Sequence, residues 1–242
     1  MTAVVLQARM DSTRLPGKSL LPLGDKPMVS RVMEALRFIP ADLYVLACPS
    51  SCAGVFEAPA RDEGFVISPG PSADVLARYC IAIRRFGIKR VIRATADNPF
   101  VFADAAQALN AEAESLGASY AGYSGLPFGT GVESVDSGAL LRAERDAVRP
   151  GEREHVCPYL YNHGEIFSLH RPLAPKPWRE PSLRLSVDTR GDYERAVLLH
   201  EELLRRALPG EGRFNGAAVI AAARDLYAGN TGPDTRVVRE FK

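Results

Sequence analysis

The sequence has little cysteine, little net charge and no long apolar run. Its 242 residues include four cysteines, none in a C-x-x-C spacing, which excludes the usual sequence pattern of a structural zinc site. Cys48 and Cys52 are near enough along the chain for a loop disulfide, but we expect free thiols, as in a reducing cytoplasm. The formal net charge is +1, so the composition indicates no nucleic acid and no membrane surface as a partner.

The apolar runs are too short to cross a bilayer. The first of them, residues 3–6, is soon followed by the charged Arg9, so we expect no signal peptide and a cytoplasmic location. Hydrophobic residues make up 46% of the chain and charged residues 24%, which is typical of a globular protein. A chain of this length can bury a full core, and we expect a single domain over residues 1–242.

Short apolar segments alternate with helical segments in the first half of the chain. Residues 3–6, 43–47, 65–67 and 89–95 are typical of buried strands, and helical patterns follow at 28–38, 53–63, 74–86 and 103–116. This alternation predicts an α/β fold with three layers, in which helices cover both faces of a mostly parallel sheet. In the second half we expect a loop at 119–131, strands at 132–135 and 183–187, helices at 193–206 and 217–228, and a polar tail from residue 229.

A cationic loop follows the first predicted strand. It carries Arg9, Arg14, Lys18 and Lys26, and its glycines let the backbone approach a ligand closely. A loop of this kind after the first strand of an α/β fold is suited to holding phosphates. Two other interpretations stay open: a solvated connection, and a Walker A loop, although Ser12 stands where that motif needs its first glycine.

Two carboxylates come directly after predicted strands. Asp97 follows the strand at 89–95, and Asp188 follows the strand at 183–187. The carboxyl ends of neighbouring parallel strands converge on one crevice, where two carboxylates repel each other unless a cation lies between them. For Asp97, an Asx turn within Asp97-Asn98-Pro99 is the purely structural alternative.

The stretch QARMDSTRLPGKSLLPLGDKPM resembles the signature of the sugar-activating cytidylyltransferases. That family includes the enzymes that make the CMP adducts of ketodeoxyoctonate and sialic acids, and the chain is most similar to its spore-coat-polysaccharide type. The resemblance implies a nucleotide-diphospho-sugar transferase-like (Rossmann-like) fold. It also implies that Arg9, Arg14 and Lys18 hold the triphosphate of CTP, and that Gln7 and Ala8 contact the nucleotide.

Two further segments extend the resemblance on the nucleotide side. The segment PGPSADVL resembles the family segment near the base and ribose, with Ser72 and Asp74 as the polar positions; either residue is equally suited to cap the following helix. The segment RATADNPF implies that Asp97 binds Mg²⁺, or Mn²⁺ in its place, although Ala96 stands where the family usually has glycine. Asp188 resembles the family's second aspartate of the metal site.

The second half of the chain carries the residues that the resemblance assigns to the acceptor. Glu133 stands where the family has an acidic residue near the acceptor sugar, although Gly131 replaces the usual aspartate before the Val-Glu pair. The segment REHVCPY resembles a stretch of the spore-coat type, and Arg153, Glu154 and His155 would form an acceptor-binding set.

The expected function is nucleotidyl transfer. An oxygen of a sugar or related acidic acceptor attacks the α-phosphorus of CTP, pyrophosphate leaves, and a CMP or CDP adduct forms. The first alternative is a glycosyltransferase with a nucleotide-sugar donor, which normally shows an Asp-x-Asp pair where this chain has Asp97-Asn98. The second is a nucleotide-binding module without activity, against which the presence of Lys18, Asp97 and Asp188 argues.

One excursion stands apart from the alternating pattern. Residues 119–182 include a proline-rich stretch with the only tryptophan, Trp178. We expect this excursion to close over the site or to contact a second subunit, and the family resemblance implies a homodimer.

Overall fold

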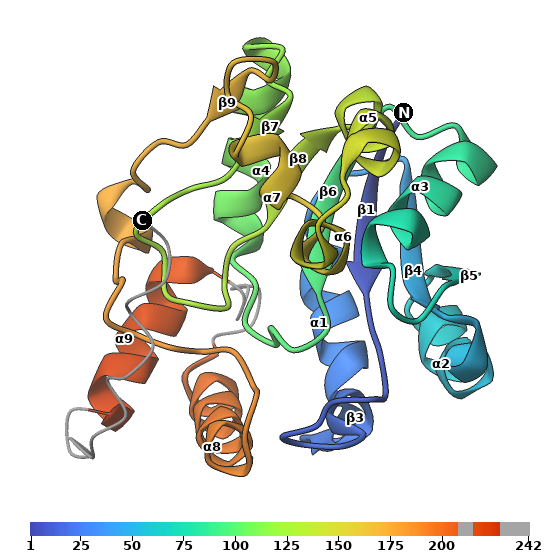
Figure 1. Cartoon of the computed structure of the whole chain (residues 1–242). Helices are drawn as coiled ribbons and strands as arrows, with labels where there is room; N and C mark the ends of the chain where they lie inside the picture. The colour runs from blue at the N-terminus through green and yellow to red at the C-terminus, as the bar shows by residue number, and fades with distance from the viewer. Residues whose placement is uncertain (208–214, 228–242) are drawn as a thin grey trace.

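The computed structural model describes residues 1–207 and 215–227. A seven-stranded sheet runs through this part of the chain in the order β5-β4-β1-β6-β8-β7-β9 (Figure 1). The first four strands are parallel, while β8 is antiparallel to both of its neighbours. The strand bounds are β1 (Thr2–Gln7), β4 (Leu43–Pro49), β5 (Val66–Gly70), β6 (Arg90–Thr95), β7 (Tyr120–Ala121), β8 (Glu133–Asp136) and β9 (Leu169–His170).

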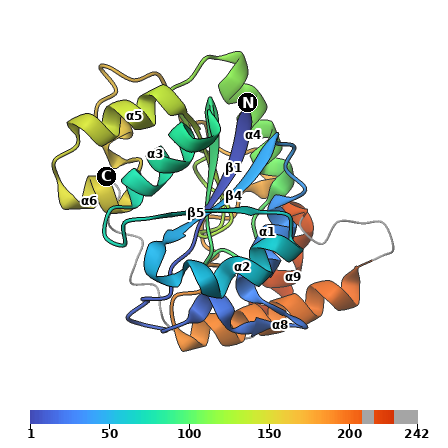
Figure 2. The ribbon, with the colours of Figure 1, turned by 90° about the vertical axis from the view of Figure 1, so that its right-hand side faces the viewer.

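The side chains of β1 alternate between the two faces of the sheet and so create two cores. Val4 and Leu6 pack with α1 (Met28–Leu36), α2 (Ala53–Asp62) and α4 (Ala103–Ser115). Ala3 and Val5 pack on the opposite face. Figure 2 shows the sheet between the two helical layers, which confirms the predicted three-layer α/β fold. The helices of the second face are α3 (Val75–Phe86), α5 (Ser137–Asp146), α6 (Pro150–His155) and α7 (Pro158–Tyr161).

A third apolar cluster joins the C-terminal helices to the N-terminal loop. It contains buried residues of α8 (Arg190–Arg206) and α9 (Gly216–Tyr227) together with Leu23 and Met28. Leu23 belongs to a small hairpin of β2 (Pro22–Leu23) and β3 (Lys26–Pro27), and the Tyr193 hydroxyl donates to the Pro22 carbonyl at 2.6 Å. The cationic loop is thereby fixed at its far end by α8.

The predicted strand at 183–187 is wrong. Leu185 N donates to the Phe128 carbonyl at 2.8 Å, and Phe128 N donates to the Leu183 carbonyl at 2.9 Å. A single bridge, between Phe128 and Arg184, is the segment's only β pairing within the described residues. The segment therefore pairs with the loop before β8 and does not enter the sheet.

Smaller differences concern other boundaries. The predicted loop at 119–131 contains β7, and β5 extends through Pro69 and Gly70, beyond the predicted strand at 65–67. All four cysteines are free thiols, as expected. The predicted tail from residue 229 and the last residue of the predicted final helix lie outside the described residues. None of the helices in residues 1–207 and 215–227 combines the length and apolar character that a membrane span requires.

Candidate active site

The loop after β1 places Lys18 beneath the carboxyl end of the sheet. Gly17 adopts a left-handed conformation, with φ of 68°, and its N–H donates to the Met10 carbonyl at 3.2 Å. This tight turn, which glycine adopts without steric cost, starts the short 3₁₀ helix η1 (Lys18–Leu20). Lys18 is consequently buried, with 7% of its surface exposed.

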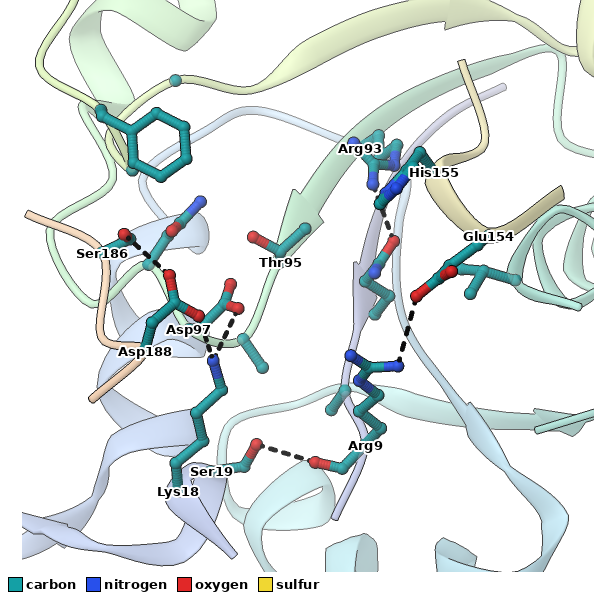
Figure 3. A pocket seen from close by; sticks show the side chains of 18 of the residues that line it. Arg9, Lys18, Ser19, Arg93, Thr95, Asp97, Glu154, His155, Ser186 and Asp188 are labelled. Carbon is teal, nitrogen blue, oxygen red and sulfur yellow. Dashed lines mark hydrogen bonds and ion pairs between the residues drawn. The ribbon is translucent and has the colours of Figure 1, made fainter. Parts of the chain in front are cut away.

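The ammonium group of Lys18 joins three oxygens from two distant segments. Nζ donates to Asp97 Oδ2 at 2.9 Å, to Asp188 Oδ1 at 3.0 Å and to the Val187 carbonyl at 2.8 Å. Figure 3 shows the side chain extending from the loop to both carboxylates. The structure therefore brings Asp97 and Asp188 together. Asp97 follows β6, whereas Asp188 is held there by the hydrogen bond from Val187 N to the Asp97 carbonyl at 2.8 Å.

The two carboxylates lie in a strongly cationic environment. Burial by itself raises the pKa of Asp97, but the charge and hydrogen bond of Lys18, with a hydrogen bond from Thr95, bring the pKa below its ordinary value. Asp188 also forms ion pairs with Arg14, at 3.1 Å, and with Arg184. Asp97 is thus held as an anion, and both carboxylates face cations.

A cavity of about 400 Å³ opens beside this cluster, over the ends of β1 and β6. Arg9 and Glu154 face each other across it at 3.8 Å (Figure 3). Eight of the predicted site residues line the cavity: Gln7, Ala8, Arg9, Lys18, Asp97, Glu154, His155 and Asp188.

Five predicted site residues do not line this cavity. Arg14 does not line the cavity itself but forms an ion pair with Asp188, which does. The hydroxyl of Ser72 lies 3.4 Å from Asp11, and Asp74 caps α3 by accepting from Ala77 N at 2.9 Å. The other two, Glu133 and Arg153, are held in ion pairs with Arg93 and Asp74 respectively.

Arg153 fastens α6 to the start of α3. Its Nε donates to Asp74 Oδ2 at 2.6 Å, and its Nη1 donates to the carbonyls of Glu144 and Ala147. The Arg153 guanidinium is therefore engaged by protein groups and not by the cavity. These contacts position Glu154 and His155, the next two residues, at the cavity.

Glu133 belongs to a buried network that reaches the cavity through other residues. It pairs with Arg93 and accepts a hydrogen bond from the Tyr120 hydroxyl at 2.8 Å. Arg93 Nη2 in turn donates to Gln7 Oε1 at 3.0 Å, and the Tyr79 hydroxyl contacts the same oxygen at 3.3 Å. Gln7 is therefore oriented by a network that Glu133 supports from behind.

Several residues that line the cavity were not predicted from the sequence. Arg93, Thr95 and Asn98 lie inside the RATADNPF segment, where the end of a predicted strand was the available signal. Arg78 lies on the buried face of α3, next to Tyr79. The remaining ones are Ser19, Val75, Ala96, Phe128, Gly129, Gly131 and Ser186.

A metal ion at this site would depend on few protein ligands. Among the described residues, no group of three or more His, Cys, Asp or Glu side chains is placed to hold a metal. Asp97 and Asp188 nevertheless both lie within 3.0 Å of a single cationic atom, Lys18 Nζ. Two carboxylates, completed by water and phosphate oxygens, match the preference of Mg²⁺.

Comparisons with known proteins identify the family of the chain. The family model described as cytidylyltransferase matches residues 3–211. The spore coat polysaccharide biosynthesis protein SpsF of Bacillus subtilis is 31% identical over 205 residues, which cover 82% of this chain and 85% of that protein.

Two solved structures share the fold. A cytidylyltransferase from Leptospira borgpetersenii superposes with a TM-score of 0.82 at 24% identity and covers 94% of this chain and 95% of its own. A CMP:2-keto-3-deoxy-manno-octonic acid synthetase complexed with CTP has a TM-score of 0.65 at 16% identity, over 83% of this chain and 98% of its own. On the match of the family model over most of its length, and on its identity to SpsF, the chain belongs to the cytidylyltransferase family.

Proposed function

We propose that the protein transfers the cytidylyl group of CTP to an oxygen of a sugar-type acceptor and releases pyrophosphate. The observation that carries the proposal is the cluster of Lys18, Asp97 and Asp188 at the end of the cationic loop. Family membership and the fold shared with a synthetase solved with CTP support the choice of nucleotide.

The residues of the loop would bind and orient the triphosphate. Arg9 lines the cavity, and Arg14 lies at its edge with 63% of its side chain exposed, so both guanidinium groups are accessible to phosphate oxygens. The reaction needs an acceptor oxygen in line with the bond to the leaving pyrophosphate. Positioning and charge neutralisation supply most of the rate enhancement in such transfers, so no protein nucleophile is required.

Asp97 and Asp188 are the residues that would hold Mg²⁺, or Mn²⁺ in its place. Such an ion, when bound, neutralises charge on the phosphates and polarises the phosphorus centre. In the structure, Lys18 is a cation that both carboxylates contact. The Lys18 ammonium and the two carboxylates would therefore lie together beneath the bound triphosphate, with the ammonium balancing their negative charge.

The acceptor would occupy the part of the cavity between Phe128 and His155. Glu154 and His155 line it from α6, and Ser186 lies on the opposite side (Figure 3), with Phe128 also in the wall of the cavity. Glu133 and Arg153 would support acceptor binding only indirectly, through their ion pairs. A homodimer, expected from the family resemblance, stays a prediction that sedimentation velocity tests.

The decisive experiment is release of pyrophosphate. The protein is incubated with Mg²⁺, each of the four nucleoside triphosphates and a panel of acidic sugars, and the product is identified by ³¹P NMR. We expect pyrophosphate only with CTP and only when an acceptor is present. Pyrophosphate release with another nucleotide but not with CTP contradicts the proposal. Transfer of sugar from a nucleotide-sugar donor would favour the glycosyltransferase alternative.

A further inference from the structure

Arg78 is a charged side chain enclosed in the wall of the cavity. It lies on α3, only 1% of its surface is exposed, and it is among the largest fully buried side chains of the protein. Its pKa is lowered from the ordinary value by burial, although an arginine stays protonated near neutral pH. A buried charge is costly unless partners compensate it.

Protein groups form hydrogen bonds with only one edge of the Arg78 guanidinium. Nη1 donates to the carbonyls of Pro71 and Ser72 at 2.8 and 2.9 Å. Nε is buried without a hydrogen-bond partner, and within the described part of the chain neither Nη2 nor Nε donates to any protein group. No described carboxylate pairs with Arg78, and the nearby cation Arg9 adds to the effect of burial in lowering its pKa.

The free edge of Arg78 is a fixed pair of donors. Nε–H and one N–H of Nη2 point in parallel, which is the fork that binds two adjacent acceptors. The two carbonyl contacts hold the far side of the group, and Gly70 leaves room for its stem, because a Cβ at Gly70 would come within 3.0 Å of Arg78 Cγ. The cavity that Arg78 lines therefore contains a preorganised site for a two-acceptor ligand.

The surroundings of Arg78 favour a base over a phosphate. Ala8 and Val75 line the same cavity and offer apolar surface, which suits the face of an aromatic ring. Gln7 also lines it, with its Oε1 already occupied by Arg93 and Tyr79, so its amide N–H groups remain as donors. The phosphate-binding candidates Arg9 and Lys18 come from a different element, the loop after β1.

We propose that Arg78 reads the pyrimidine edge of the nucleotide and selects cytosine through its adjacent N3 and O2 acceptors. The inference rests on the proposed use of CTP. Uracil presents an N3–H donor in place of the N3 acceptor, so one of the two Arg78 donors would face another donor. A buried donor left unsatisfied is costly, and this cost would supply the discrimination against UTP.

Nucleotide binding without acceptor tests the proposal by calorimetry. The ligands are CTP, UTP and 3-deaza-CTP, in which a C–H replaces N3. The proteins are the wild type, Arg78→Met, Arg78→Lys and a control, Arg85→Met. Arg85 is exposed on the same helix, outside the cavity. Lysine keeps the charge of Arg78 but loses the fork, so both Arg78 variants should behave alike.

We expect the wild type and Arg85→Met to bind CTP about 10- to 100-fold more tightly than UTP or 3-deaza-CTP. Both Arg78 variants should lose most of that preference, with CTP affinity falling far more than UTP affinity. The 3-deaza-CTP arm needs no variant, so the test survives if an Arg78 variant does not fold.

Two results overturn the assignment of Arg78. One is a wild type that binds 3-deaza-CTP as tightly as CTP. The other is an equal loss of CTP and UTP affinity in folded Arg78 variants, which would make Arg78 a phosphate ligand or a support of the loop at Pro71. A wild type that binds no CTP overturns the proposed function itself, so the two failures are distinguishable.

Discussion

Lys18 Nζ and Asp97 Oδ2 lie 2.9 Å apart, and the same ammonium group also contacts Asp188 and the Val187 carbonyl. An ammonium has three donors, so all of them are used by protein oxygens. A contact between Lys18 and a phosphate therefore requires Lys18 to give up one of these partners. If Lys18 contacts the nucleotide as proposed, nucleotide binding would be coupled to the positions of both carboxylates.

Replacing Lys18 should affect both stability and CTP binding. Lys18→Met leaves two partly buried carboxylates without their shared cation, and we expect the free energy of unfolding to fall by about 1–3 kcal/mol. Urea denaturation measures that change, and calorimetry of the folded protein should show weaker CTP binding. A variant with wild-type values in both measurements would contradict the assigned role of Lys18.

Arg14→Ala should weaken CTP binding with little effect on stability. Arg14 is largely exposed, so its contribution to the fold is small, whereas a charge-assisted contact with phosphate is worth about 1.5–3 kcal/mol. That value corresponds to a loss of affinity of roughly 10- to 100-fold. Arg14→Lys should also be impaired if the contact is bidentate. Arg61→Ala, an exposed change on α2, is the matched control and should bind CTP normally.

Asp97→Asn and Asp188→Asn should each abolish turnover, and a chelator should stop the wild type. The reason is that each variant removes one of the two carboxylates available to a divalent ion. Pyrophosphate release against Mg²⁺ concentration is the measurement. The melting temperature of each variant without metal should be lower than that of the wild type, because each aspartate is a partner of Lys18. If repulsion between the two carboxylates dominated instead, the melting temperature would rise. Full activity of either variant would show that the pair is not a metal site.

The stability of the protein should fall in acid partly through Asp97. The pKa of Asp97 is below its ordinary value of 3.8 in the folded protein, so its ionised form stabilises the fold above about pH 4. This contribution is lost as pH falls through the folded pKa. Asp97→Asn should therefore have a flatter profile of unfolding free energy below pH 4 than the wild type. Glu57→Gln, at an exposed position, should leave the profile unchanged.

His155→Ala should change acceptor binding, whereas Arg153→Ala should change the stability of the fold. His155 lines the cavity, so its loss should raise the KM for the acceptor while CTP affinity and melting temperature stay constant. Arg153 joins α6 to Asp74 and two carbonyls, so Arg153→Ala should lower the melting temperature and impair acceptor kinetics only as a consequence. Identical acceptor kinetics in His155→Ala and the wild type would remove His155 from the acceptor site.

The nucleotide side of the site was more predictable than the acceptor side for a physical reason. Loop glycines and strand ends are local signals, and they placed Lys18 and Asp97 at the correct edge of the sheet. Asp188 reaches the same place although residues 183–187 do not form the predicted strand. The alternating pattern of LRLSV fits any extended segment, and so it could not show that this one stays outside the sheet. Glu133 and Arg153 were predicted to face the acceptor, yet a sequence does not show which side chains pair, and their partners Arg93 and Asp74 are distant in the chain.

Gly129 makes two distant stretches into one wall of the cavity. Its φ is +91°, and a Cβ there would come within 2.5 Å of Ser186 N, so the two backbones touch. The Arg184 guanidinium lies 4.5 Å from the centre of the Phe128 ring and also pairs with Asp188. Arg184 therefore links the Phe128 ring to the Asp188 carboxylate. If the acceptor binds beside Phe128 as proposed, this chain of contacts would link it to Asp188, and a side chain larger than hydrogen at position 129 would separate the two stretches.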